Sequence, residues 1–454
     1  MIEKRKVLLR ISKMFAAGLL TCLLGQAAQA ATVQVGSCKT GLAQYPTIGA
    51  AITGAPSGST IWICPGVYAE QLTITKNLTL EGATSGNSAG AIIIPPSAGL
   101  TENATDPAPG AAPGFPAVAA QIAVTGPATV NINHLTIDGT NNQVGCNALL
   151  LVGIYYLNAN GTISYNSVRS QTTPACPGYQ NGNGIYVEGG GNGQTSTSTT
   201  TISYNTVANY QKDGITANGY GDGSAGPAST IEDNVVIGQG PTTGAAENGI
   251  QVAFGGSSPL TSIKGNTVLD NIWAPDTNSG EGDAAAGILV YASSDITISG
   301  NTVGSAQFGI SVNSDGAQSG DGNTITMNKV DGSQVWDGID LCSNGNQVIS
   351  NTVDMSANSG VHADDSCTET SGLSSGSSNT ITQNTINTAC AGVLVGANAA
   401  STTTSPNTYY NDVSEVSSGS DTCTEPTGVG TAATMKAAAS AASSGHRLHP
   451  VPFK

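Results

Sequence analysis

Two short sequence patterns alternate along most of this chain. The first is an apolar-polar-apolar triplet, then two small or polar residues including Asn, then a β-branched residue, as in residues 163–168 and 202–207. It recurs around Asn234, Asn266, Asn301, Asn328, Asn351, Asn384 and Asn411. The second is Gly followed by Ile or Val, beginning at Gly184, Gly214, Gly249, Gly287, Gly309, Gly338, Gly360 and Gly392. Such interleaved repetition predicts a solenoid.

The length of the repeat limits what each unit can contain. Successive Gly-Ile positions lie 22 residues apart from Gly287 to Gly309 and from Gly338 to Gly360, and up to 38 apart elsewhere. Twenty-two residues cannot hold two strands and a crossover helix, but they hold three short strands and three turns. We therefore predict an all-β fold, a single-stranded right-handed parallel β-helix in which each strand pairs with its equivalent one coil onward.

Alternation within the Gly-Ile segments predicts which side chains point inward. Ile185 and Val187 fall on one face, as do Ile288 and Val290, so like residues stack on like from coil to coil. Each buried Ile or Val contributes about 1.5–3 kcal/mol, and no large aromatic core is needed. The recurring Asn is predicted at a sharp turn, in the left-handed backbone conformation, with its amide in a hydrogen-bonded column.

Composition agrees with this fold and excludes others. Gly accounts for 59 of 454 residues and charged residues for 10%, whereas helical bundles and coiled coils need many Lys, Glu and Leu. Val, Ile and Thr at strand-like spacing also argue against a disordered acidic chain.

The first thirty residues have the features of an export signal. Five basic residues between Lys4 and Lys13 precede a short apolar run, and Ala28-Gln29-Ala30 is a small-residue cleavage site. Cys22 is compatible with a lipoprotein, but the preceding Thr is a poor lipobox residue. We predict a signal peptide at 1–30, a β-helix domain at 31–415 and a flexible, low-complexity tail at 416–454, in a secreted or periplasmic protein.

The charge of the exported part limits its partners. Residues 31–454 contain 9 basic and 29 acidic residues, a formal net charge of −20. Such a surface repels phosphate backbones and anionic lipid headgroups, and no later segment reaches the ~20 apolar residues of a membrane span. We expect no nucleic-acid partner, no membrane insertion and a monomeric protein.

Eight cysteines remain after the signal, an even number that predicts disulfides in an exported chain. Eight cysteines allow 105 pairings, and we favour neighbours in the sequence. The expected bridges are Cys38 with Cys64, Cys146 with Cys176, Cys342 with Cys367, and Cys390 with Cys423. A metal site or a catalytic thiol is the alternative, but no CxxC pair supports it.

The beginning of the predicted domain adds a family resemblance. Residues 45–52 (YPTIGAAI) and 58–68 (GSTIWICPGVY) resemble the opening of secreted β-helix proteins of the pectin lyase-like superfamily. The two repeated patterns are similar to the parallel β-helix repeats of its NosD-like and carbohydrate-active members, over about residues 40–415. The resemblance implies a glycan-binding groove along one strand column, but no single activity. We expect residues 45–52 to form an N-terminal capping helix.

Outward positions of the Gly-Ile strands are predicted to form a long polar stripe with occasional aromatic residues. Hydroxyls, amides and scattered Tyr suit sugars, which present hydrogen-bonding edges and apolar faces. Among these positions we expect Tyr186, Glu188, Tyr291 and Asn313 to contact a glycan.

The richest cluster of chemical groups in the sequence contains Asp337, Asp340, His362 and Asp364. Asp340 and His362 are one 22-residue coil apart, so they are predicted to lie side by side at the ~4.8 Å strand spacing. Asp340 and Asp364 are predicted at roughly 8 Å between Cβ atoms, which overlaps the carboxylate separation of inverting glycosidases. The four residues are candidate catalytic residues.

Departures from the resembled families keep other interpretations open. Residues 336–340 resemble part of the polygalacturonase Asn-Thr-Asp-Gly signature, but Val335 and Trp336 replace its Asn-Thr. Arg169 is the only Arg between residues 31 and 446, so the basic residue of a pectate-lyase-like site is missing near the cluster. The acids are alternatively groove residues or a modest calcium site; no other cofactor is expected.

Two hypotheses follow. In the first, the protein is an exported β-helix that binds and cleaves extracellular polysaccharide, with Asp340 and Asp364 sharing acid and base roles and His362 assisting Asp340. In the second, it is a non-catalytic surface or structural β-helix that binds glycans or a protein partner.

Overall fold

The computed structural model describes residues 29–419, apart from short gaps, together with residues 449–450. The gaps are residues 86–87, 107–116, 147–148, 179, 191–196, 221–225, 241, 243–244, 258–259, 274–282, 316–317, 334–335, 366 and 368–374. Nearly all of the expected signal peptide and most of the expected tail lie outside the described residues.

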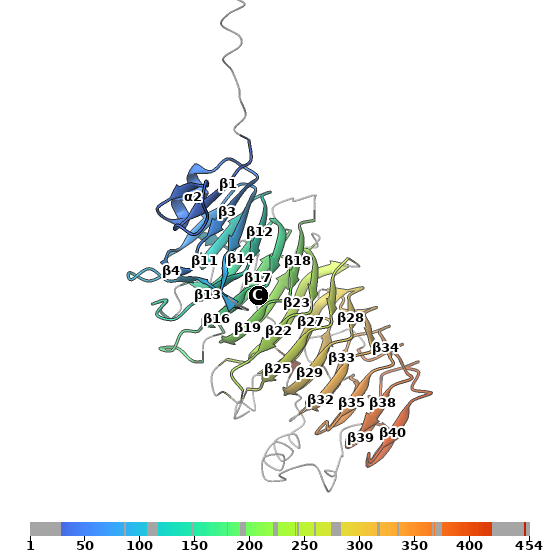
Figure 1. The fold of residues 1–454 in the computed structure, drawn as a ribbon. Helices are drawn as coiled ribbons and strands as arrows, with labels where there is room; N and C mark the ends of the chain where they lie inside the picture. Colours follow the sequence, from blue (N-terminus) through green and yellow to red (C-terminus); the bar gives the residue numbers. More distant parts are fainter. Residues whose placement is uncertain are drawn as a thin grey trace, which may run out of the picture.

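Three long sheets, almost entirely of parallel strands, form the walls of a solenoid (Figure 1). Sheet 1 runs β2 (Ala43–Tyr45), β1 (Thr32–Val35), β3 (Ser59–Ile63), β6 (Leu78–Gly82), β12 (Thr129–Asn133), β15 (Asn160–Ser164), β18 (Thr199–Ser203), β21 (Ala228–Glu232), β24 (Ser262–Lys264), β28 (Thr297–Ser299), β31 (Thr324–Thr326), β34 (Gln347–Ile349) and β37 (Thr380–Thr382). Sheet 2 runs β4 (Gly66–Ala69), β9 (Ala91–Ile94), β13 (Leu135–Asp138), β16 (Ser167–Gln171), β19 (Thr206–Tyr210), β22 (Val235–Ile237), β25 (Thr267–Asn271), β29 (Thr302–Ala306), β32 (Lys329–Ser333), β35 (Thr352–Asp354), β38 (Thr385–Asn387) and β40 (Thr408–Tyr410).

Sheet 3 contains the Gly-Ile strands. It runs β10 (Ala104–Thr105), β11 (Ala117–Thr125), β14 (Leu150–Leu157), β17 (Asn183–Glu188), β20 (Asp213–Asn218), β23 (Asn248–Ser257), β27 (Ala286–Ser294), β30 (Phe308–Asn313), β33 (Ile339–Cys342), β36 (Ser359–Ala363), β39 (Ala391–Val395) and β41 (Ser414–Ser418), and β5 (Leu72–Ile74) also pairs with β11. Two short pairs stand apart: β7 (Thr84–Ser85) with β8 (Ser88–Ala89), and β26 (Asp283–Ala284) with β42 (His449–Pro450). One coil is one pass through the three sheets, for example β15, β16 and β17. The predicted right-handed parallel β-helix is confirmed.

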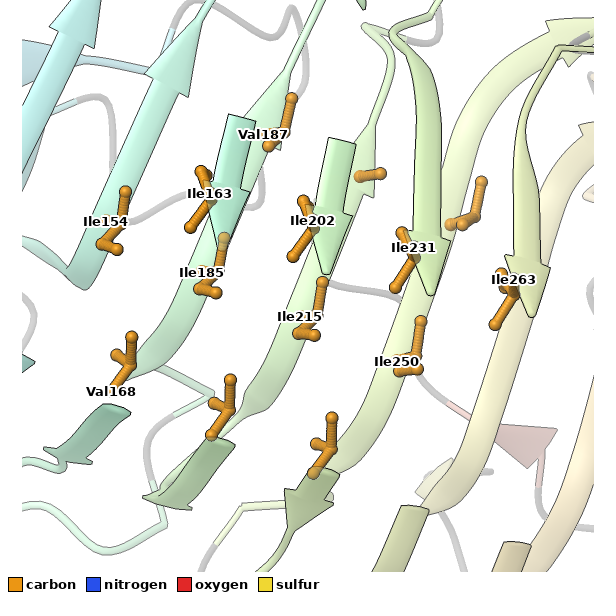
Figure 2. Packing of buried hydrophobic residues seen from close by; sticks show 14 of the residues in the cluster. Ile154, Ile163, Val168, Ile185, Val187, Ile202, Ile215, Ile231, Ile250 and Ile263 are labelled. Carbon is orange, nitrogen blue, oxygen red and sulfur yellow. The ribbon is translucent and has the colours of Figure 1, made fainter. Parts of the chain in front are cut away.

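The core is a set of stacked aliphatic columns between the three walls. In sheet 3, one column consists of Ile185, Ile215, Ile250, Ile288, Ile310, Ile339, Val361 and Val393, each paired with the next. These side chains are completely buried. Figure 2 shows two such columns facing each other, one through Ile185, Ile215 and Ile250 and one through Ile163, Ile202 and Ile231. The predicted inward face is therefore confirmed.

A column of asparagine amides fixes the turn between sheets 1 and 2. The backbone N and Nδ2 of each Asn donate to Oδ1 of the Asn one coil onward, at 2.9–3.1 Å. Its members are Asn166, Asn205, Asn234, Asn266, Asn301, Asn328, Asn351, Asn384 and Asn407. The predicted hydrogen-bonded column is confirmed.

Two details of that prediction are wrong. Except at Asn407, which follows Pro406, the left-handed conformation belongs to the residue before the column Asn, as at Tyr165, Met327 and Gly300, with φ of 58°, 56° and 65°. The chain therefore turns at the residue before the Asn, and the Asn itself directs its amide along the column. The final member is Asn407, because Asn411 is exposed and its Nδ2 donates to Oδ1 of Asn387 outside the column.

A short helix, α2 (Ile48–Gly54), lies at the N-terminal end of the solenoid (Figure 1). Oγ1 of Thr47 accepts a hydrogen bond from Ala50 N at 3.0 Å, which is an N-cap. Ile48 and Ile52 are buried in the main core. The predicted helix is present, although Tyr45 belongs to β2, and its role as an end cap stays a prediction.

Three of the four expected disulfides are present: Cys38–Cys64, Cys146–Cys176 and Cys342–Cys367. The expected partner of Cys390, Cys423, lies outside the described residues. Within the described part of the chain, no helix has the length and apolarity needed to cross a membrane.

Candidate active site

The outward side chains of sheet 3 form columns, because the register keeps equivalent residues side by side. One column contains Tyr186, Thr216, Gln251, Leu289, Ser311, Asp340, His362 and Leu394. This column is polar except for Leu289 and Leu394, and large apolar residues lie beside it on β23, β27 and β30. There Leu289, Tyr291 and Phe308 pack with Trp336 in a cluster outside the main core.

The outward face is buried, contrary to the expected open groove. Asp340 and Asp364 are 0% exposed and His362 is 3% exposed. Side chains that pack against one another form a second layer over this sheet, and the apolar cluster around Tyr291 is part of it. Alternation predicted the direction of these side chains correctly but not what covers them.

The predicted contact between Asp340 and His362 is present. The two residues are direct partners on β33 and β36, and Oδ1 of Asp340 lies 3.8 Å from Nδ1 of His362. Oδ2 of Asp337 lies 3.5 Å and Oδ2 of Asp364 lies 3.7 Å from the same nitrogen. Three carboxylates therefore converge on one imidazole, and we call these four residues the acid–imidazole cluster.

Neighbouring polar groups fix the orientation of two of the carboxylates. Oδ1 of Asp337 accepts hydrogen bonds from Nδ2 of Asn358 at 2.8 Å, from the backbone N of Ser359 at 3.0 Å and from Oγ of Ser359 at 2.5 Å. Oγ of Ser311 donates to Oδ2 of Asp340 at 3.1 Å. In each carboxylate one oxygen is anchored, and the other oxygen faces His362.

The Cys342–Cys367 disulfide borders the acid–imidazole cluster. Sγ of Cys342 lies 3.5 Å from Oδ2 of Asp340 and 3.9 Å from Oδ2 of Asp364. The bridge closes a segment of 25 residues that includes β36 with His362. It therefore holds Asp364 against the strand that carries Asp340.

The predicted glycan contacts do not form one surface with this cluster. Asn313 lies beside Cys342 on adjacent strands, and its Oδ1 lies 3.2 Å from Oγ of Ser311. Tyr291 is part of the apolar cluster, with its ring 5.4 Å from that of Phe254. β17, which carries Tyr186 and Glu188, is five strands from β33, roughly 24 Å at the usual strand spacing. All four side chains are buried.

A second group of acids, which sequence reasoning missed, surrounds Glu188. The hydroxyl of Tyr155 donates to Oε2 of Glu188, and the side chains of Asp106 and Glu188 also share a hydrogen bond. Burial, and then the charge of Asp106, raise the pKa of Glu188 well above its ordinary value. A hydrogen bond between two carboxyl groups requires a proton on one of them, so this pair holds a proton where isolated carboxyls would be ionised.

A buried lysine lies further along the same sheet. Nζ of Lys212 donates to the carbonyl of Ala246 at 2.6 Å and lies 4.0 Å from Oδ1 of Asp213. Burial raises the pKa of Glu247 to about 9, although backbone donation from Gln239 and the charge of Lys212 oppose the shift. One sequence signal was available, because Asp213 precedes Gly214 as Asp337 precedes Gly338.

The acid–imidazole cluster offers proton donors, proton acceptors and metal ligands. Asp337, Asp340 and His362 present one ligand atom each within 4.8 Å of one another. Carboxyl and imidazole groups are the side chains that most often act as general acids and bases.

Comparison with protein families identifies part of the chain. Residues 152–353 match the family model described as right handed beta helix region. No curated protein matches the sequence significantly.

Several solved structures resemble the chain. The GH136 lacto-N-biosidase from Eubacterium ramulus is 12% identical over 85% of this chain and 67% of that chain, with a TM-score of 0.49. The A-module of mannuronan C-5 epimerase AlgE4 from Azotobacter vinelandii is 14% identical over 79% of this chain and 89% of that chain, with a TM-score of 0.39. Pectin methylesterase PemA from Erwinia chrysanthemi is 16% identical over 62% of this chain and 80% of that chain, with a TM-score of 0.36. At these values the similarities carry no argument about activity or substrate.

Proposed function

We propose that the chain, a right-handed parallel β-helix, belongs to the pectin lyase-like superfamily, is exported, and binds and cleaves extracellular polysaccharide at the acid–imidazole cluster. The observation that carries this proposal is the convergence of Asp337, Asp340 and Asp364 on Nδ1 of His362, at 3.5–3.8 Å. Carboxyl groups and an imidazole at one place can supply both a general acid and a general base.

The proposed reaction is hydrolysis of a glycosidic bond. The protonated member of the Asp340–Asp364 pair gives its proton to the leaving oxygen as the bond to the anomeric carbon breaks. The ionised member takes a proton from water, whose oxygen bonds to that carbon, so the pair regains its single proton. His362, whose Nδ1 lies 3.8 and 3.7 Å from the two carboxylates, assists Asp340.

The charge of the protein bears on the substrate. A chain with a net charge of −20 over residues 31–454 favours neutral sugars, unless calcium bridges it to a uronic polymer. We therefore expect neutral glucans, mannans or xylans to be better substrates than pectate or alginate in the absence of calcium.

The test is reducing-sugar release and unsaturated-product absorbance across neutral and uronic polysaccharides, with and without calcium. Asp340→Asn and Asp364→Asn should each reduce sugar release at least about 100-fold, as loss of general acid–base catalysis does. Asp331→Asn is a matched control, because this half-exposed carboxylate lies on β32, away from the cluster. Wild-type activity in both cluster variants would overturn the proposal.

Burial favours a second candidate, a non-catalytic β-helix whose outward polar residues are structural. Tyr186, Glu188, Tyr291 and Asn313, together with the cluster itself, are at most 5% exposed. In that case no polysaccharide is cleaved, and Asp340→Asn lowers the melting temperature without altering glycan-array binding. A melting temperature that is unchanged while sugar release is lost would exclude this candidate.

A further inference from the structure

We infer that Asp337, Asp340 and His362 form a binding site for a divalent transition cation such as Zn²⁺ or Mn²⁺. The inference concerns the protein without substrate and does not require polysaccharide cleavage. It rests on the spacing of the donor atoms, on how the carboxylates are held and on the chemical nature of the donors.

The donor atoms of Asp337, Asp340 and His362 are close enough together to share one cation. One ligand atom from each lies within 4.8 Å of the other two. Nδ1 of His362 lies 3.5 and 3.8 Å from carboxylate oxygens of Asp337 and Asp340. Donors at about 2.0–2.2 Å from a tetrahedral Zn²⁺ lie about 3.3–3.6 Å apart, so the two distances from Nδ1 are at or slightly above that separation.

The carboxylates are held as metal ligands are held. Asp337 is anchored through Oδ1 by Asn358 and Ser359 and presents Oδ2 to the imidazole. Asp340 is anchored through Oδ2 by Ser311 and presents Oδ1. Hydrogen bonds to the outer oxygen fix the orientation of a ligating carboxylate and maintain metal affinity. These anchoring groups lie outside the cluster, so they are independent of the spacing.

The donor set favours a transition cation over calcium. Ca²⁺ takes six to eight oxygen ligands, whereas this cluster combines one imidazole nitrogen with carboxylate oxygens. Zn²⁺ and Mn²⁺ accept that combination. The four side chains are at most 4% exposed, and a divalent cation offsets the free-energy penalty of burying several carboxylates together.

Calorimetric titration of the untagged, chelator-stripped protein with ZnCl₂, MnCl₂ and CaCl₂ tests this site. We expect one equivalent of Zn²⁺ or Mn²⁺ and weaker binding of Ca²⁺. His362→Gln should weaken binding by more than the roughly 10–100-fold that loss of an outer hydrogen-bonding partner causes. His134→Gln is the matched control, since His134 contacts Glu81 on the surface and should leave binding unchanged.

Two further measurements separate this site from other sources of binding. His446 and His449 are the remaining histidines. A His446→Gln/His449→Gln variant should still bind one equivalent of Zn²⁺ or Mn²⁺. Co²⁺ should give a visible absorption band of a low-coordinate site that disappears in His362→Gln. Circular dichroism confirms that each variant is folded, and Asp337→Asn provides a second variant should His362→Gln not fold.

Unchanged binding in folded His362→Gln and Asp337→Asn proteins would overturn the inference, as would the absence of any binding to wild type. The outcome is distinguishable from that of the proposed function. Sugar release by a protein that binds no cation refutes the cation site alone. Cation binding without sugar release on any polysaccharide refutes cleavage alone.

Discussion

Asp340 and His362 are direct partners on neighbouring strands, with Oδ1 of Asp340 3.8 Å from Nδ1 of His362. Twenty-two residues separate them in the sequence, and a single coil brings them into contact. At this distance in a buried site, the ionisation of one residue depends on the charge of the other.

Asp340→Asn should shift the imidazole NMR signals of His362, because it changes the carboxylate that lies 3.8 Å from Nδ1. The imidazole signals, with His362→Gln for assignment, measure the change. Asp331→Asn should leave these signals where they are, and an equal shift in that control would contradict a local effect.

Asn266→Ala should lower the free energy of unfolding by about 2–5 kcal/mol. Asn266 donates to Ile231 O and to Asn301 Oδ1, and its Oδ1 accepts two hydrogen bonds from Asn234. Truncation leaves buried donors and acceptors without partners, which costs about 1–3 kcal/mol each. Urea denaturation measures the loss, and Asn411→Ala, at an exposed amide, should change it by less than about 0.5 kcal/mol.

Glu247→Gln should flatten the pH dependence of stability between about pH 4.3 and pH 9. The pKa of Glu247 is about 9 in the fold because of burial, against about 4.3 in an unfolded chain. The folded state therefore binds more protons in this window, and stability falls by up to about 1.4 kcal/mol per pH unit as pH rises.

Thermal melts at pH 5, 7 and 9 test this dependence on Glu247. The advantage of Glu247→Gln over wild type should grow with pH. Glu102→Gln, at an exposed carboxyl, should track wild type at all three values. Parallel wild-type and Glu247→Gln curves would contradict the assignment.

Gly300→Val should destabilise the protein by about 1–2 kcal/mol, whereas Gly300→Asn should cost less. Gly300 has a φ of 65°, and a Cβ built there meets no atom within 4 Å, so backbone strain is the only penalty. Asn tolerates the left-handed region far better than a β-branched residue. Equal losses in the two variants, compared by melting temperature, would point to a steric cause.

A Cys342→Ser/Cys367→Ser variant should lose about 2–4 kcal/mol of stability, the usual contribution of a disulfide. It should also shift the imidazole NMR signals of His362, because the bridge holds Asp364 beside the imidazole. Cys146→Ser/Cys176→Ser is the control, since it removes a bridge of similar span far along the solenoid. A similar stability loss without a change at His362 is expected there.

The fold was predictable because its sequence pattern repeats at short intervals, of 22 to 38 residues. Ile and Val recur at positions that must stack for the chain to bury them, and this fixed the sheet 3 register that pairs Asp340 with His362. The end of the asparagine column was missed because Asn407 and Asn411 both follow Asn384 at plausible intervals. The 23-residue interval to Asn407 matches that from Asn328 to Asn351, and only the hydrogen bonds decide between them.

Contacts that cross the repeat were not predictable. Asp106 reaches Glu188 from the segment after β10, which pairs antiparallel with β11 and follows no periodic rule. The burial of Tyr186 and Tyr291 depends on a second layer of side chains, whereas alternation specifies only the side of the strand. Asp337 was identified by its place before Gly338, but its anchoring by Asn358 and Ser359 depends on the next coil.

Among the described residues, β40 and β41 are the outermost rungs of sheets 2 and 3 at the end opposite α2. Tyr410 and Val416 on these strands are 54% and 48% exposed. In a stack whose layers touch only their neighbours, cohesion at a terminal layer is roughly half that of an interior one. Thermal or mechanical unfolding should therefore begin at this end. Amide hydrogen exchange should slow progressively from β41 towards the middle of the stack.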